Sequence, residues 1–208
     1  NLKGKELEYV TEAVRSEWVS TAGSYVSDFE ASIADYVGVR GAVACQSGTA
    51  GIHTALILAG VKPDDLVIVP TLTFIAAVNP VKYLNADPVF MDCDDSLCID
   101  PSKVRAFCAH ECEMRNGVLF HKASNRRVSA LVVVHVFGNM ADMGELMEIA
   151  HEFNLMLIED ATEALGTYYE EGPFAGSYAG TIGDIGIYSF NGNKIITTGG
   201  GGMILSRS

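Results

Sequence analysis

One lysine stands in a glycine-rich stretch near the end of the sequence, YSFNGNKIITTGGGG at residues 188–202. It follows an expected strand end at Tyr188-Ser189 and precedes four consecutive glycines. A lysine that forms a Schiff base reacts as the free amine. It therefore needs a pocket that lowers its pKa and a flexible backbone that lets a ligand approach closely. We expect no acid beside Lys194, because a salt bridge would hold the ammonium form. A solvated lysine beside a hairpin has the same local pattern.

A short apolar run ends on two carboxylates at residues 155–160, LMLIED. A carboxylate at the buried end of a strand is costly unless it is paired or hydrogen-bonded. Asp160 is therefore expected either to cap the next helix or to hold a cation. Glu163, three residues later, is positioned to complete a local capping arrangement or to face the same pocket.

Two further stretches follow strands and open with small or hydroxyl-bearing residues. In CQSGTAG, residues 45–51, the N–H groups of a helix start and the hydroxyls of Ser47 and Thr49 suit a phosphate, although a simple N-cap has the same pattern. The stretch lacks the lysine of a P-loop, and no G-x-G-x-x-G motif follows the first strand. Both observations argue against an ATPase and an NAD-binding protein. In PTLTF, residues 70–74, Phe74 has a flat face for an aromatic ligand or a place in the core.

The apolar pattern predicts an α/β fold that would bring these stretches together. Helical periodicity predicts two opening helices, and short β-branched runs then alternate with helical segments. The expected helices are 7–18, 29–37, 49–59, 73–84, 101–109 and 142–153, and the expected strands are 41–45, 66–69, 88–91, 130–134, 155–158 and 203–205. Such alternation is typical of a three-layer sandwich with a mostly parallel sheet. Ligands in these folds bind beyond the carboxyl ends of strands.

Composition limits the classes of function. The 208 residues, 49% hydrophobic and 19% charged, are enough for one domain with a sizeable core. A net charge of −12 argues against nucleic-acid and membrane-surface partners. Because no apolar run reaches the length of a membrane span and no secretion signal opens the sequence, we expect a cytoplasmic protein.

An irregular region at residues 107–128 contains most of the remaining chemical signals. Turn residues at Asn116-Gly117 predict a surface hairpin or an Ω-like loop within 113–128. The motif CAHEC at 108–112, with His121 beyond it, has metal-ligating side chains, but zinc sites usually pair ligands at a second matching motif. We therefore favour a helix end and loop, with no metal site. The odd number of cysteines, five, favours reduced thiols.

Four ordered motifs, SGTAGIHTAL, PTLTF, IEDATEALG and YSFNGNKIITTGGGGM, together resemble the DegT-type sugar-nucleotide aminotransferases, fold type I enzymes that use pyridoxal 5'-phosphate (PLP). The resemblance is closest to the enzymes of perosamine and legionaminic-acid pathways. It implies that residues 1–208 form an N-terminal segment and the large PLP-binding domain, without the family's C-terminal small domain. It also implies a homodimer.

The resemblance assigns a role to each matching residue. Lys194 corresponds to the lysine that forms a Schiff base with the cofactor and moves a proton during catalysis, and Asp160 to the carboxylate that keeps the pyridine nitrogen protonated. Phe74 corresponds to the aromatic residue stacked on the ring. Gly48, Thr49 and Ser189 correspond to the phosphate cradle.

Three more residues are assigned less directly. Glu163 occupies the position of a polar residue near the ring hydroxyl, where a glutamate has to be protonated or bonded through another donor. His135 and Asn139, in VHVFGN, either flank the ring or belong to the core.

The implied reaction moves an amino group from L-glutamate to a nucleotide-linked keto sugar. A related dehydratase branch has histidine in place of the lysine, so Lys194 favours the aminotransferase. The alternatives are a PLP-dependent sugar dehydratase or isomerase on the same fold, and a truncated, non-catalytic homologue that acts as a binding or dimerisation module.

Overall fold

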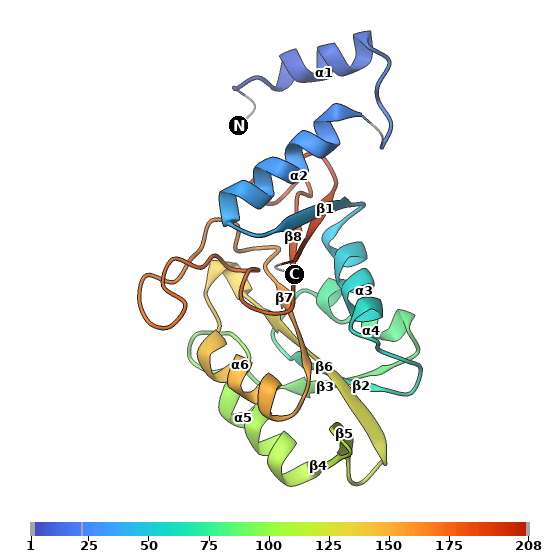
Figure 1. Ribbon diagram of the computed structural model, residues 1–208, viewed down its shortest axis with the longest axis vertical. Helices are drawn as coiled ribbons and strands as arrows, with labels where there is room; N and C mark the ends of the chain where they lie inside the picture. The colour runs from blue at the N-terminus through green and yellow to red at the C-terminus, as the bar shows by residue number, and fades with distance from the viewer. Residues whose placement is uncertain (1–2, 22, 207–208) are drawn as a thin grey trace.

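The computed structural model describes residues 3–21 and 23–206, and within these ranges the strands form one nine-stranded sheet (Figure 1). Seven strands lie in the order β1-β9-β8-β7-β6-β2-β3. Their bounds are Gly41–Cys45 (β1), Leu66–Pro70 (β2), Asp87–Met91 (β3), Arg126–Val134 (β6), Met156–Asp160 (β7), Ile185–Ser189 (β8) and Gly202–Ser206 (β9). The predicted α/β class is confirmed.

The sheet is mostly parallel, as predicted, and one of these seven strands is reversed. β8, β7, β6, β2 and β3 pair in parallel, whereas β9 runs antiparallel to both β1 and β8. The register pairs Asp160 with Val134 on one side and with Ile187 on the other. The carboxyl ends of β1, β2, β6, β7 and β8 therefore lie along the same edge of the sheet.

Helices cover both faces of the sheet (Figure 1). On one face, α3 (Gly48–Leu58) and α4 (Asn79–Tyr83) pack against Val67 and Val69 of β2 in a buried apolar cluster. On the other face, α6 (Met143–Glu152) and α5 (Pro101–Ala106) cover the centre of the sheet, and α2 (Ser24–Val37) covers β8 and β9. The result is the predicted three-layer sandwich.

Two of the predicted helices are interrupted. The segment 73–84 forms a 3-10 turn, η1 (Ile75–Ala77), and then α4, which has Pro80 in its first turn. Pro80 has no N–H group to donate to the preceding turn, so it starts a new helix instead of continuing one, and one continuous helix was the wrong prediction. The helix predicted at 101–109 ends as α5 at Ala106 and continues as a π-helical turn, η2 (Phe107–Glu111).

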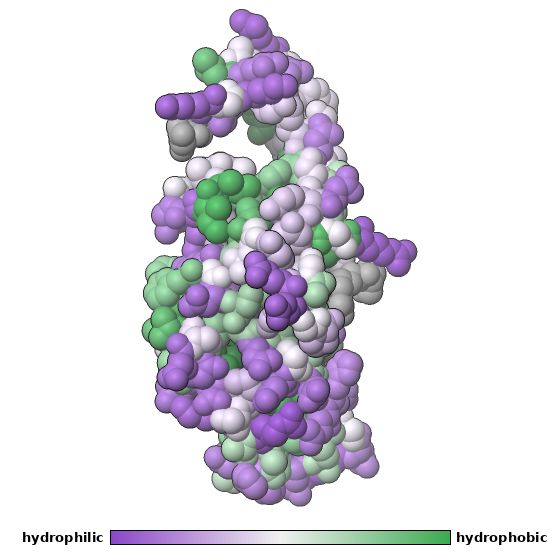
Figure 2. Space-filling model, turned by 90° about the vertical axis from the view of Figure 1, so that its left-hand side faces the viewer, coloured by the Kyte–Doolittle hydropathy of each residue, from purple (hydrophilic) through white to green (hydrophobic). Residues whose placement is uncertain are grey.

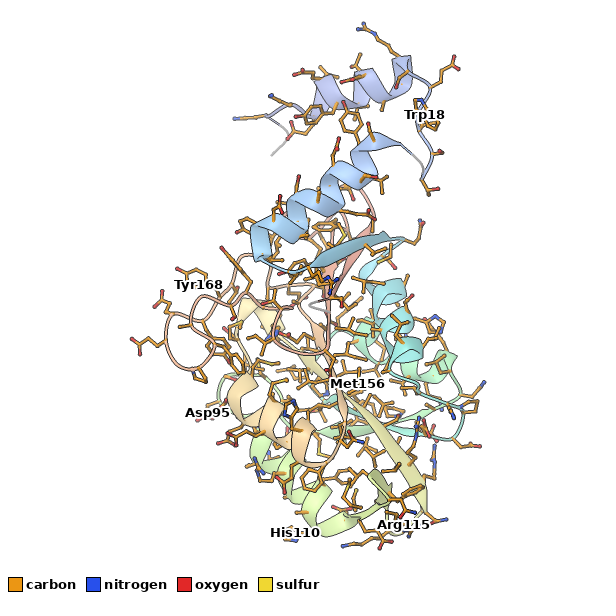
Figure 3. All side chains as sticks on the ribbon, in the orientation of Figure 1. Trp18, Asp95, His110, Arg115, Met156 and Tyr168 are labelled. Carbon is orange, nitrogen blue, oxygen red and sulfur yellow. The ribbon has the colours of Figure 1, made fainter. Side chains whose placement is uncertain are left out.

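The predicted hairpin is confirmed, and it extends the sheet. β4 (Cys112–Arg115) and β5 (Val118–His121) pair antiparallel, and β5 then pairs with the start of β6. Figure 3 shows Arg115 and His110 at this lower end of the molecule.

The first helix, α1 (Glu6–Arg15), stands apart from the sheet in Figure 1 and has no buried residue among those described. It is shorter than the predicted 7–18, and Trp18 lies in the connection to α2, 59% exposed (Figure 3). Polar and charged residues cover much of the face shown in Figure 2, including most of α1. Within the described ranges, no helix combines the length and apolarity that crossing a membrane requires.

Candidate active site

A pocket of about 510 Å³ opens at the carboxyl edge of the sheet, beside the start of α3. Its walls come from segments that follow β1, β2, β6, β7 and β8. All seven site residues predicted from the sequence line it, namely Gly48, Thr49, Phe74, Asp160, Glu163, Ser189 and Lys194. The fold thus brings together four motifs that are far apart in the sequence.

Asp160 is the last residue of β7 and is almost completely buried, with 4% of its surface exposed. Its Oδ1 accepts a hydrogen bond of 3.1 Å from the N–H of Thr162. Burial raises the pKa of Asp160 above its ordinary value, although hydrogen bonds from Thr162 and the positive charge of Lys194 oppose the shift. A carboxylate in this setting is stabilised by a cationic or N–H donor placed in the pocket.

Lys194 lies in the loop between β8 and β9, which is closed at its base by Phe190. The N–H of Phe190 donates to Gly201 O at 2.9 Å, and the N–H of Thr198 donates to Phe190 O at 3.0 Å. The ring of Phe190 is buried and packs edge-on against Phe29 of α2, with ring centroids 4.8 Å apart. Buried packing therefore anchors the glycine-rich loop that carries Lys194.

The expectation that no acid lies beside Lys194 is wrong. Although no acid is near it in the sequence, the fold places Glu163 Oε1 3.5 Å from Lys194 Nζ. The other oxygen, Oε2, accepts a hydrogen bond of 3.0 Å from the N–H of Phe137. Glu163 thus contacts both a backbone N–H group and the lysine at the pocket.

The start of α3 forms a close corner with the ends of β7 and β8. Ser47 caps the helix by accepting a hydrogen bond of 3.1 Å from the N–H of Ala50. A Cβ atom on Gly48 would lie 2.8 Å from Thr162 Cγ2 and 3.1 Å from Ser189 Cβ, so glycine is required there. Backbone N–H groups and hydroxyls meet in this corner, as in sites that bind an anion at a helix N-terminus.

Two aromatic rings line the pocket and are largely exposed, Phe74 at 72% and Phe137 at 73%. Phe74 follows β2 and was predicted to contact a ring. Phe137 was not predicted, because nothing in the stretch VHVFGN distinguishes its phenylalanine from a core residue. Thr162, Asn191 and Asn193 were also not predicted.

His135 lies outside the pocket lining and is fully buried, as the core alternative predicted. Its Nε2 is 2.9 Å from Glu159 Oε2, and its Nδ1 accepts a hydrogen bond of 3.2 Å from the N–H of Ala141. Asn139 is directed elsewhere, because its Nδ2 donates to Ser96 O at 3.0 Å.

Three of the candidate metal ligands around the CAHEC motif are buried or hydrogen-bonded within the protein. Cys108 and Cys112 are buried free thiols, and burial raises their pKa values to about 12 and about 11. Nδ1 of His121 is 2.8 Å from Ser124 Oγ. Among the described residues, no cluster of three or more His, Cys, Asp or Glu side chains is arranged to hold a metal ion.

This α/β architecture, with a lysine and a buried carboxylate in one pocket at the carboxyl edge of the sheet, matches the fold of solved aminotransferases. The chain belongs to the DegT/DnrJ/EryC1/StrS aminotransferase family, whose model matches residues 1–208. The resemblance inferred from the motifs is therefore confirmed.

Individual aminotransferases and related enzymes are similar to this chain in sequence or in fold. GDP-perosamine synthase of Caulobacter vibrioides is 41% identical over 204 residues, 98% of this chain and 49% of the synthase. An aminotransferase from Psychrobacter cryohalolentis has a TM-score of 0.84 at 30% identity, covering 100% of this chain and 48% of that one. NtdA from Bacillus subtilis, solved with bound cofactor PMP, has a TM-score of 0.78 at 27% identity, over 97% of this chain and 41% of that one. The chain thus spans about half the length of the synthase.

Proposed function

We propose that this chain carries the cofactor site of a PLP-dependent aminotransferase that moves an amino group from L-glutamate to a nucleotide-linked keto sugar. The observation that carries the proposal is the shared pocket of Lys194 and Asp160. Its family, and a relative that is a GDP-perosamine synthase, support the class of substrate. We also propose that residues 1–208 comprise the N-terminal segment and the large domain of this enzyme.

The residues in the pocket fit the chemical groups of PLP. The carboxylate of Asp160 suits a protonated pyridine nitrogen, since burial makes an isolated charge there costly. The corner formed by Gly48, Thr49 and Ser189 suits a phosphate, because a side chain on Gly48 would fill it. Phe74, largely exposed on the wall, has a free face for an aromatic ring.

When bound, PLP supplies an aldehyde that takes up the amino group and a pyridine ring that accepts electrons from the substrate. Lys194 would hold the cofactor covalently through Nζ. As a free amine, the same Nζ can take a proton from the carbon that loses the amino group and return it to the carbon that gains it. Glu163, 3.5 Å away, keeps Nζ directed into the pocket.

Asp160 contributes a fixed negative charge at the pocket floor. With PLP bound, it would keep a proton on the pyridine nitrogen, because removal of that proton would leave the buried carboxylate without a cationic partner. The short hydrogen-bonded link to Thr162 prevents the carboxylate from turning away. Asp160 and Lys194 thus act on different parts of one bound group.

We further propose a cytoplasmic homodimer, as the family resemblance implies. Apolar side chains near the pocket are exposed in the described chain, including Phe74 at 72%, Ile195 at 61% and Ile75 at 56%. A second copy of the chain would bury such a rim. Light scattering at high protein concentration tests this, and a strictly monomeric protein would contradict it.

Borohydride reduction followed by peptide mass analysis tests cofactor and lysine together. Purified protein incubated with PLP should carry a phosphopyridoxyl group on the peptide that contains Lys194, and Lys194→Ala should not. Addition of L-glutamate before reduction should shift the visible absorbance and prevent the adduct. A protein that takes up no PLP contradicts the proposal, and one that takes it up without responding to glutamate favours a dehydratase or isomerase.

A further inference from the structure

Phe137 has an unusual backbone conformation at the edge of the pocket. It lies in the short turn η3 (Val136–Gly138) with φ 56° and ψ 20°, which is the left-handed region. Residues with bulky side chains rarely adopt this region, and strained backbone of this kind is concentrated at ligand sites. The surrounding structure must therefore hold Phe137 in this conformation.

Contacts on both sides of Phe137 fix the turn. Its own N–H donates to Glu163 Oε2 at 3.0 Å. The N–H of Gly138 donates to His135 O at 3.2 Å, and Gly138 O accepts a hydrogen bond of 3.1 Å from Thr167 Oγ1. His135 is itself buried and bonded to Glu159. The backbone of Phe137 is thus tied to the rigid core, although its ring is not.

The ring contributes little to the core, because 73% of Phe137 is exposed. Its position therefore has no packing advantage that would compensate for the strained backbone. It lines the pocket on the solvent side, whereas Asp160 forms the buried floor. An exposed apolar ring at a pocket mouth is well suited to be covered by a ligand.

The position of the Phe137 backbone relative to Lys194 indicates which part of a ligand this residue would meet. One carboxylate, that of Glu163, contacts both the N–H of Phe137 and Nζ of Lys194. The reacting carbon of a substrate has to come close to Nζ. The group nearest Phe137 would then be the ring that carries this carbon, rather than the more distant diphosphate and nucleoside.

We propose that Phe137 is a specificity-determining residue whose ring packs against the apolar face of the keto sugar. This inference rests on the proposed function. A phenyl ring has no hydrogen-bonding group, so it suits the C–H face of a deoxy sugar better than a charged diphosphate. The turn holds the backbone of Phe137 on the same carboxylate that contacts the amine of Lys194.

Two substitutions that tolerate left-handed backbone, Phe137→Gly and Phe137→Asn, test the inference in the purified holoenzyme. Both should raise the KM for the nucleotide-linked keto sugar about tenfold, the usual scale of an aromatic contact, while the KM for L-glutamate stays within about twofold. Inhibition by the nucleoside diphosphate alone should be unchanged. The Tm of the cofactor-free protein should not fall, since glycine relieves the strain.

Three outcomes would overturn the inference. An unchanged KM for the sugar substrate would remove the contact, and a parallel loss of nucleoside diphosphate affinity would assign the ring to the nucleoside. A lower Tm in both variants would make the ring structural. Failure of the proposed function is recognised separately, because the unsubstituted protein would then not convert its cofactor with L-glutamate.

Discussion

Glu159 and His135 form a fully buried pair behind the pocket, with Oε2 and Nε2 2.9 Å apart. Because Ala141 donates to Nδ1, the proton of the neutral ring lies on Nε2 and points at Glu159. The same carboxylate accepts hydrogen bonds from the N–H groups of Gly180 at 2.9 Å and Ile182 at 2.6 Å. Adjacent strand residues point to opposite faces, so Glu159 anchors surrounding loops while its neighbour Asp160 faces the pocket.

Replacement of Glu159 by glutamine should destabilise the protein strongly. The amide would present N–H₂ to groups that are themselves donors, and breaking a buried, hydrogen-bonded pair typically costs about 3 kcal/mol. Urea unfolding of the cofactor-free protein measures the loss, with the exposed Glu170→Gln as the matched control within about 0.5 kcal/mol. Equal stability of the two variants would show that the pair contributes nothing.

The contribution of Glu159 should depend on pH in a defined direction. Burial acts to raise its pKa, but the hydrogen bond from His135, with those from the N–H groups of Gly183 and Gly180, lowers the pKa below its ordinary value. A group with a depressed folded-state pKa stabilises the protein fully above its unfolded pKa, about 4.3, and loses that contribution as the pH falls. The stability difference between the native protein and Glu159→Gln should therefore be largest near neutral pH and shrink below about pH 4.

The thiols of Cys108 and Cys112 should be unreactive in the folded protein. Burial raises their pKa values to about 12 and about 11, so the thiolate form is scarce at pH 8. A thiol reagent at pH 8 should label the half-buried Cys93 first and these two only after unfolding. Rapid labelling of both thiols would contradict this prediction. A lower Tm after addition of a chelator would favour a metal site at the CAHEC motif.

The strands were the most predictable part of the fold. β1 and β2 could be located within a residue because each is a continuous run of apolar or small residues, and their chain direction follows from helical crossovers. The direction of β9 could not be predicted, because an apolar run reads the same for either direction. The break before α4 is marked in the sequence by Pro80, which lacks the N–H group that a continuous helix needs.

The site was predictable where a motif contains the signal and not where the fold creates it. Asp160 and Lys194 are each recognisable in their own stretch, and the parallel sheet explains why strand ends converge. The contact between Glu163 and Lys194 joins residues from different segments, so the local sequence around Lys194 gave the wrong expectation. The left-handed Phe137 was equally hidden, because its conformation depends on contacts with Glu163 and Thr167.

Asp160→Asn should stabilise the cofactor-free protein while abolishing its cofactor binding. Burial raises the pKa of this carboxyl, so keeping it charged at neutral pH costs stability. A raised folded-state pKa makes the penalty appear as the pH rises above the unfolded value of about 3.9, and an amide avoids it. We expect a gain of about 1 kcal/mol at pH 7, measured by urea unfolding without PLP.

The exposed Asp35→Asn is the matched control and should leave both properties unchanged. Absorbance titration with PLP provides the second measurement, in which Asp160→Asn should show a large loss of affinity. If the variant bound PLP as tightly as the unsubstituted protein, the carboxylate would have no part in holding the cofactor.

Gly48→Ala should distort the corner proposed to hold the phosphate. The new methyl would lie 2.8 Å from Thr162 Cγ2 and 3.1 Å from Ser189 Cβ, and overpacking of this kind costs about 1–3 kcal/mol. Gly41→Ala is the control, because a Cβ there meets no atom within 4 Å. Both variants are compared by urea unfolding and by PLP titration, where only Gly48→Ala should weaken binding.

A change at Thr162 tests whether steric overlap with its Cγ2 methyl causes the losses in Gly48→Ala. Thr162→Ser removes the Cγ2 methyl that the alanine at position 48 would strike, but it keeps the hydroxyl and the backbone N–H that serve Asp160. In the double variant, part of the stability and PLP affinity lost in Gly48→Ala should return, giving a coupling of about 1 kcal/mol between neighbouring sites. Strictly additive effects would mean that the close approach of α3 to the end of β7 does not determine the shape of this corner.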